Sequence, residues 1–143
     1  MLNILLLLLH FYFPYINYDS IDVSPDFFLL IILSSSLKLS QNKILVLSFS
    51  IGVLKDILTQ YYFFGLLSFI HILLGYITIR IQSIKDKIFQ YSYIFFIIFI
   101  YFLINYMLQY SESYIFYLKF SFIKAFLTFL TFFLFKTIFK KSF

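Results

Sequence analysis

Long apolar runs separated by short polar segments dominate the chain. Between Ile44 and Ile79, thirty-six residues contain only two formal charges, the adjacent Lys55 and Asp56. Apolar runs of this length are typical of helices that cross a lipid bilayer, which need about 20 apolar residues each. The pattern therefore predicts an all-α integral membrane protein.

The same pattern predicts six membrane spans in a single polytopic domain, residues 1–143. We expect Pro14 to kink or end the first span, which has no cleavage site and should be retained. The second span is short, so it should be thickened by its serines, tilted or sheltered by neighbours. Three residues mark its start: Ser24 can cap the helix, Pro25 suits the first helical position, and Asp26 lies near the positive end of the helix dipole. The predicted spans are 2–16, 27–37, 44–60, 65–79, 88–110 and 114–135.

Basic residues occupy alternate loops. Segments 38–43, 80–87 and 136–143 hold eight of the eleven Lys and Arg residues, whereas the other three loops, at 17–26, 61–64 and 111–113, hold none. By the positive-inside rule, both termini are cytoplasmic and all six spans cross the membrane. The net charge of +5 then reflects topology, with anionic lipid headgroups as a further partner, and does not indicate nucleic acid.

The amino-acid composition excludes several classes of protein and several kinds of catalytic site. The chain is 63% hydrophobic with a mean hydropathy of +0.99, too apolar for a soluble domain of 143 residues. It has no Cys, so thiol catalysis and cysteine metal sites are excluded, and its three Gly cannot build a phosphate loop. Ser121-x-x-Lys124 matches a serine–lysine nucleophile pattern without its companion motifs. We expect no enzyme activity, no cofactor and no metal.

Small and polar residues form stripes on three of the predicted helices. One stripe of this kind lets two helices approach closely and hydrogen-bond, so we interpret the stripes as a packed bundle interior. A polar pathway for a substrate or proton is the alternative. We expect His71 to be a satisfied interior histidine. The stripes consist of Ser48, Gly52 and Asp56; of Ser68, His71, Gly75 and Thr78; and of Tyr101, Asn105 and Gln109.

Asp56 and Lys124 lie at matching depth. Each is roughly 17–18 Å from the cytoplasmic edge when the rise along a helix is counted. An unpaired charge at that depth is costly, so we expect Asp56 and Lys124 to pair across the third and sixth helices. Lys55 points away from the Asp56 face, and we expect it, like Lys119, to extend outward.

The chain contains an ordered set of short features: Pro25-Asp26, the basic hinge Lys38–Lys43, Gly52-x-x-x-Asp56, Gly65 and Gly75-Tyr76. Their order and spacing resemble the MreD family, the rod shape-determining membrane proteins of bacteria. The resemblance covers about 55 of the 143 residues, from Asp26 to Arg80. One departure is Phe63, where the family often has proline.

The resemblance implies a six-helix protein of the bacterial inner membrane, similar in fold to the substrate-binding subunits of energy-coupling-factor transporters. It implies no catalysis. Such proteins bind MreC, a bitopic protein with an extracytoplasmic coiled coil, and link MreB filaments to the RodA glycosyltransferase and its transpeptidase during cell elongation. Pro25, Asp26, Gly52, Asp56 and Gly65 match the family pattern, and structural or partner-docking roles are expected for them.

Two other classes of protein share the predicted architecture. A substrate-binding subunit of an energy-coupling-factor vitamin transporter would need small residues in its first span, where this chain has Leu5–Leu9. An ion or proton channel would need more carboxylates inside the membrane than Asp56 alone. Both features disfavour these classes, so a scaffold of the MreD type is the expected function, with the vitamin-transporter subunit as the alternative.

Overall fold

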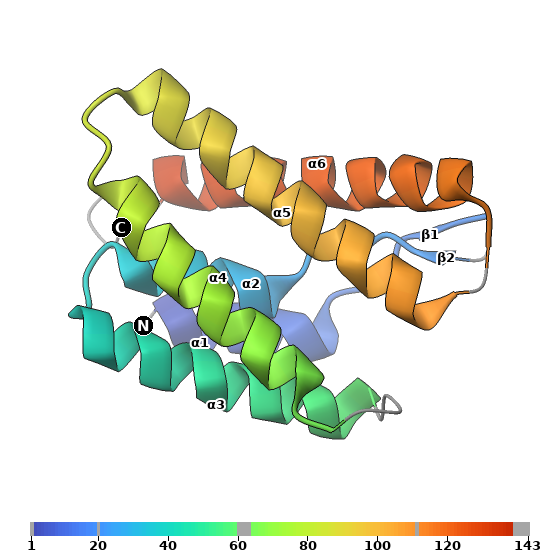
Figure 1. The fold of residues 1–143 in the computed structure, drawn as a ribbon, viewed down its shortest axis with the longest axis horizontal. Coiled ribbons are helices and arrows are strands. Elements are labelled where there is room, and N and C mark those ends of the chain that lie inside the picture. Colours follow the sequence, from blue (N-terminus) through green and yellow to red (C-terminus); the bar gives the residue numbers. More distant parts are fainter. Residues whose placement is uncertain (1, 20, 60–63, 111, 139–143) are drawn as a thin grey trace.

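The computed structural model describes residues 2–19, 21–59, 64–110 and 112–138, and the regular secondary structure in them is helical apart from one small hairpin (Figure 1). The all-α prediction is therefore confirmed. The elements are α1 (Leu2–Tyr12), β1 (Asn17–Tyr18), β2 (Ile21–Asp22), α2 (Phe27–Ser36), α3 (Gln41–Thr59), α4 (Leu66–Gln82), α5 (Lys87–Gln109) and α6 (Tyr114–Ile138).

The helices form a bundle around α2. Helix α3 packs on α4 and α5 packs on α6, while α2 contacts α1, α3, α4 and α6. Both ends of the described chain lie at one end of the long axis, together with the α2–α3 and α4–α5 loops (Figure 1). The β1–β2 hairpin and the α5–α6 connection lie at the opposite end, which we call the hairpin end.

All ten residues of α2 are buried. This helix has no polar face, which is the pattern of a helix surrounded by protein on every side. It is therefore sheltered by its neighbours, one of the three expected explanations for its short length. Its serine-rich end is held by side chains of other elements: Asn3 Nδ2 donates to Ser35 Oγ at 2.8 Å, and Gln82 bonds to Ser36.

The start of α2 differs from the prediction. Asp26, and not Ser24, is the N-cap, because its Oδ1 accepts a hydrogen bond from the Leu29 N–H at 3.2 Å. Pro25 precedes the cap. The hairpin takes up Ser24 instead: its Oγ accepts from the Ile16 N–H at 3.0 Å and donates to Asp22.

Several helix ends extend beyond the predicted spans. Helix α1 stops at Tyr12, before Pro14, as expected for a proline that cannot continue a helix. Helix α2 ends one residue before the predicted span. Helices α3 and α5 begin earlier than predicted and α4 and α6 end later, so Lys43, Arg80 and Lys136 lie in helical turns and not in loops. Long aliphatic stems let such cations reach water from a helix end. The predicted turn at 61–64 falls mostly outside the described residues, as do Lys140 and Lys141.

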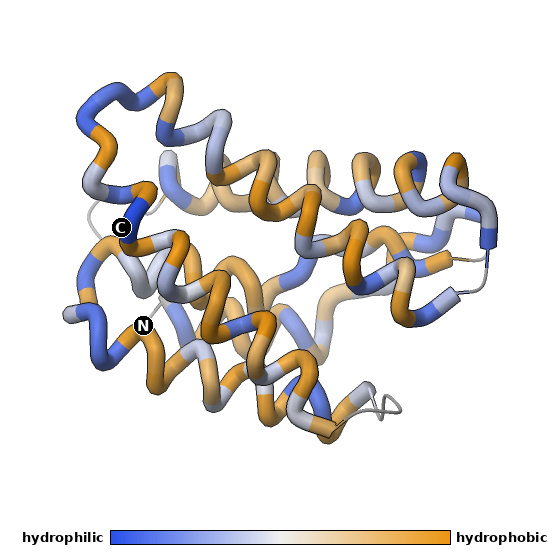
Figure 2. The backbone as a smooth tube through the Cα atoms, viewed as in Figure 1, coloured by the Kyte–Doolittle hydropathy of each residue, from blue (hydrophilic) through white to orange (hydrophobic). Residues whose placement is uncertain are grey.

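Helices α5 and α6 are each long and apolar enough to cross a membrane, by length and composition. Their outward side chains are apolar: Phe96 and Phe126 are about half exposed. Their buried positions include polar residues such as Asn105 and Thr128. Hydrophobic residues accordingly run along the helices, and hydrophilic residues gather in the turns at both ends (Figure 2).

Two glycines allow α3 and α4 to approach closely. A Cβ at Gly52 would clash with the Ser68 backbone, and a Cβ at Gly75 would clash with the Ser48 side chain. The predicted stripes of these two helices therefore face each other, as the packing interpretation requires.

We predict that Gly52→Ala destabilises the bundle by about 1–3 kcal/mol, because the added methyl meets backbone atoms that cannot move aside. Thermal unfolding in detergent, followed by circular dichroism, measures the loss. Ser50→Ala is the matched control, since Ser50 is exposed on the same helix. Equal unfolding temperatures for Gly52→Ala and the wild type would contradict the close approach.

Candidate functional site

Asp56 caps α4 from the neighbouring helix. Its Oδ2 accepts from the Gly65 N–H at 3.1 Å, the Ser68 N–H at 3.0 Å and the Ser68 hydroxyl at 2.6 Å, and its Oδ1 accepts from the Leu67 N–H at 3.1 Å. These are first-turn donors that have no partner within their own helix. The carboxylate also lies at the positive end of the α4 dipole. Asp56 is only 2% exposed, so the cap is internal.

Gly65 makes this cap possible. It is the N-cap residue of α4, with a left-handed backbone angle φ of +96° and nothing nearby that a Cβ would touch. Glycine is needed here for conformation and not for space. The left-handed turn is part of the backbone path that presents the N–H groups of Gly65, Leu67 and Ser68 to one carboxylate.

The predicted Asp56–Lys124 pair is wrong. Lys124 Nζ donates instead to Asp22, with its Oδ2 at 3.0 Å and its carbonyl oxygen at 3.2 Å. Matching depth does not bring two residues together when they point to different neighbours. Asp56 faces α4, and the backbone donors of that helix occupy both of its oxygens.

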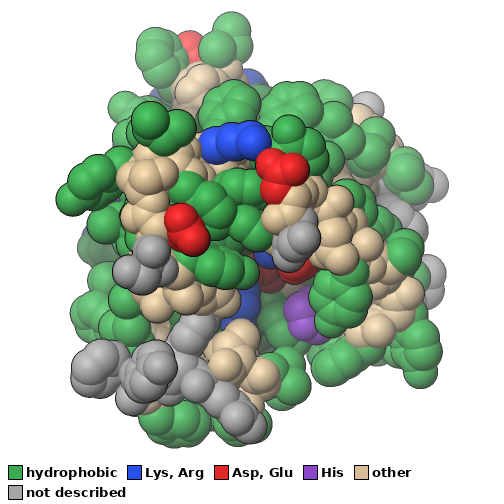
Figure 3. Space-filling view, turned by 90° about the vertical axis from the view of Figure 1, so that its right-hand side faces the viewer, with side chains coloured by type: hydrophobic (Ala, Val, Ile, Leu, Met, Phe, Trp, Pro, Cys, Tyr) green, Lys and Arg blue, Asp and Glu red, His purple; other side chains and the backbone are tan. Residues whose placement is uncertain are grey.

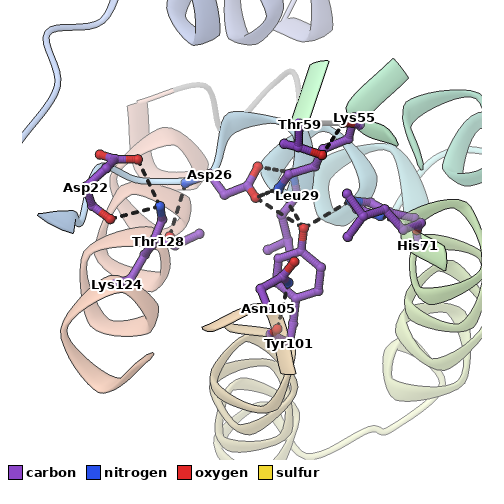
Figure 4. A network of polar contacts seen from close by, with 11 residues as sticks. Asp22, Asp26, Leu29, Lys55, Thr59, His71, Tyr101, Asn105, Lys124 and Thr128 are labelled. Atoms are coloured by element: carbon purple, nitrogen blue, oxygen red, sulfur yellow. Dashed lines mark hydrogen bonds and ion pairs between the residues drawn. The ribbon is translucent and has the colours of Figure 1, made fainter. Parts of the chain in front are cut away.

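The prediction that Lys55 extends outward is also wrong. Its Nζ forms an ion pair with Asp26 Oδ2 and donates to the Tyr101 hydroxyl at 2.7 Å (Figure 4). The side chains of Lys55 and Asp26 are 16% and 5% exposed. A carboxylate and a hydroxyl within reach inside the bundle favour pairing over extension to the surface. Lys119, in contrast, is exposed and pairs with Asp19 at 3.1 Å.

His71 and Tyr101 extend this ion pair into a four-residue network. His71 Nδ1 lies 2.7 Å from the Leu67 carbonyl oxygen, which can only accept, so Nδ1 carries a proton. The Tyr101 hydroxyl lies 3.2 Å from His71 Nε2 and 3.4 Å from Asp26 Oδ2. His71 is thus a satisfied interior histidine, as predicted. The network joins the N-terminus of α2 to α3, α4 and α5 (Figure 4).

A second ion pair, Lys124 with Asp22, ties α6 to the hairpin. Burial acts to raise the pKa of Asp22, but the Lys124 ammonium and the hydrogen bonds from Ser24 outweigh it and hold that pKa below its usual value. The Tyr106 hydroxyl donates to the Asp22 carbonyl oxygen at 3.0 Å. The hairpin is thereby fixed to both α5 and α6.

The two ion pairs line one cavity of about 500 Å³. Figure 3 views the hairpin end and shows acidic, basic and histidine side chains inside a hollow bordered by hydrophobic ones. Aromatic side chains make up much of the wall. The polar lining is His10, Asp22, Ser24, Asp26, Lys55, Thr59, Asn105, Gln109 and Lys124.

The residues singled out in the sequence fall into four groups. Ser48, Gly52 and Gly75 form the α3–α4 contact, Asp56 and Gly65 form the internal cap, and His71 belongs to the network. Pro25, Asp26 and Lys124 line the cavity.

Sequence reasoning did not identify Lys55, Asp22 and His10 as part of this site. The available signal was the α5 stripe: Asn105 and Gln109 both line the cavity, and Tyr101 belongs to the network beside it. A polar stripe on a long apolar helix marked the side on which the site lies.

Comparison with protein-family models, with curated proteins and with solved structures finds no match to this chain. Within residues 2–19, 21–59, 64–110 and 112–138, no group of three or more His, Cys, Asp or Glu could hold a metal ion.

We predict that Asp56→Ala lowers the free energy of unfolding by about 2 kcal/mol or more, because two buried N–H groups and one partly buried N–H group lose their acceptor. Asp56→Asn keeps one acceptor oxygen and should lose less. Asp86→Ala is the matched control, since Asp86 caps α5 at an exposed site through the Ile88 N–H at 2.9 Å. Denaturant unfolding in detergent measures all three variants. Restoration of stability by an added Lys124→Asp in an Asp56→Lys background would contradict the internal cap.

The Asp22–Lys124 pair should make stability depend on acid pH. The pKa of Asp22 is lower when folded than its unfolded value of about 3.9. Its contribution is therefore present above the unfolded pKa and disappears as pH falls through the folded pKa. The unfolding temperature of wild type should thus drop more steeply below pH 4 than that of Asp22→Asn. Parallel pH profiles for the two proteins would refute the pairing.

Proposed function

We propose that the chain is a multi-pass protein of the bacterial inner membrane, with all six helices embedded and both termini cytoplasmic. The outward faces of the described helices support this, since large apolar side chains on α1, α3, α4, α5 and α6 are exposed. Such a surface is unfavourable in water but suits contact with lipid. Asp26, Asp56 and His71 are among the buried polar residues, as expected for a bundle that keeps its polar groups away from lipid.

Within that membrane, the proposed role is a non-catalytic scaffold of the cell-elongation machinery, of the MreD type. The observation that carries it is the α3–α4 corner. Gly52, Asp56 and Gly65 are among the residues that carry the family resemblance, and here they join α3 to α4 by close packing and internal capping. These contacts fix how α3 and α4 lie against each other, and so fix the outward surface that the two helices present.

The proposed partner is a bitopic MreC-like protein, through which the chain connects indirectly to MreB-like filaments, a RodA-like glycosyltransferase and its transpeptidase. The loops at 37–40, 83–86 and 110–113 contain four residues each, and the longer α1–α2 segment is held against α5 and α6 through Asp22, so these segments offer little surface for docking. The partner's single span would therefore lie against an outward helix face. Membrane lipids cover the remaining faces.

Single-cysteine crosslinking tests this proposal, because the chain contains no Cys and every introduced thiol is unique. Leu8 on α1, Phe49 on α3, Phe96 on α5 and Phe126 on α6 are each about half exposed and sample four faces. After labelling with a photoreactive thiol reagent in native membranes, we expect a bitopic coiled-coil protein to crosslink strongly from one face only.

The four variants control for one another, since each replaces an outward apolar residue. Recovery of no bitopic coiled-coil protein from any of the four positions would reject the scaffold. Equal recovery from all four would reject a defined docking face.

A further inference from the structure

The cavity at the hairpin end has the dimensions of a small-molecule site. Its volume of about 500 Å³ lies within the range of roughly 300–1,000 Å³ found for ligand pockets. Seven of its eighteen lining residues are Phe or Tyr, contributed by α1, α2, α5 and the segments next to them. Phe11, Phe102 and Tyr106 are among them. Aromatic walls of this kind favour a planar ring, which can stack on them or meet them edge-on.

The charges in the cavity balance. Two carboxylates, Asp22 and Asp26, and two ammonium groups, Lys55 and Lys124, line it, and they are joined in two ion pairs. A ligand with a net charge would add an uncompensated charge to this partly desolvated site, which is unfavourable. A ligand without net charge adds no such cost.

Hydrogen-bonding capacity remains for such a ligand. An ammonium group has three N–H donors. In the described part of the chain, Lys55 uses two of them on Asp26 and Tyr101, and Lys124 uses two on Asp22. The Asn105 amide nitrogen donates to the Tyr101 carbonyl at 2.7 Å, and the structure gives its oxygen no partner among the described residues. Acceptors and donors on the edge of a ring would meet these groups.

We propose that the cavity binds a small aromatic molecule without net charge, its ring against the Phe and Tyr walls and its polar edge toward Lys55, Lys124 and Asn105. The site is formed by this chain alone. It therefore goes beyond the scaffold function and does not rest on it.

A series of indole compounds tests the proposal, using the full-length protein in detergent. The chain has no Trp, so indole fluorescence can be excited without exciting the protein's tyrosines strongly. Indole is neutral, L-tryptophan is zwitterionic, tryptamine is a cation and indole-3-acetate is an anion, all on the same ring. We expect saturable binding of indole or L-tryptophan, and at least tenfold weaker binding of the two charged compounds.

Two matched variants locate the site. Thr59 lines the cavity and Ser50 does not, yet both are exposed on α3 and both donate to the carbonyl four residues earlier, at 2.7 and 2.9 Å. Thr59→Phe should reduce affinity at least tenfold, and Ser50→Phe should leave it unchanged. If Thr59→Phe does not fold, Tyr15→Ala replaces it, because Tyr15 is a wall residue that is 78% exposed.

Three results would overturn the proposal. These are no saturable binding by any of the four compounds, equal binding of the charged and uncharged compounds, or equal effects of the Thr59 and Ser50 variants. None of them alters the crosslinking experiment, which needs no ligand. Failure of the cavity site and failure of the scaffold are therefore distinguishable.

Discussion

The hydrogen bonds between the Asp56 carboxylate and the first turn of α4 are the interaction on which the rest of the bundle depends. A helix that begins inside a protein must find acceptors for its first N–H groups. Asp56 supplies them from α3 and so fixes where α4 starts relative to α3. With that end fixed, Gly52 and Gly75 allow the two helices to stay in close contact along their length.

Lys55, the residue next to Asp56, holds α3 to a different set of neighbours. Successive residues on an α-helix point about 100° apart, since one turn takes 3.6 residues. When Asp56 faces α4, Lys55 therefore faces elsewhere, toward Asp26 and Tyr101. The two adjacent charges that interrupt the long apolar run thus hold α3 to different neighbours. A buried ion pair adds little net stability, but removal of one partner leaves an uncompensated charge, so the pair mainly enforces one arrangement.

Much of the fold followed from the sequence. The six apolar runs located the six helices, Pro14 indicated where the first one stops, and the small-residue stripes identified the α3–α4 contact. The partners of the charged residues did not follow. Depth in the membrane is one coordinate only: Asp56 and Lys124 were predicted to share it, but they face different elements. The Lys55–Asp26 pair depends on which helices become neighbours, and tertiary packing decides that. The cap of α2 was misplaced because the hairpin competes for Ser24, and the sequence gives no measure of that competition.

The complete burial of α2 has a consequence for the order in which the protein can be assembled. Its ten residues are too few to cross a bilayer alone. Its N-terminus is held by the Thr128 hydroxyl, which accepts from the Asp26 N–H at 3.3 Å across 102 residues of sequence. During synthesis, α2 leaves the ribosome long before α6 exists. In the proposed membrane setting, α2 can therefore be fully enclosed only after the later helices that surround it have been made.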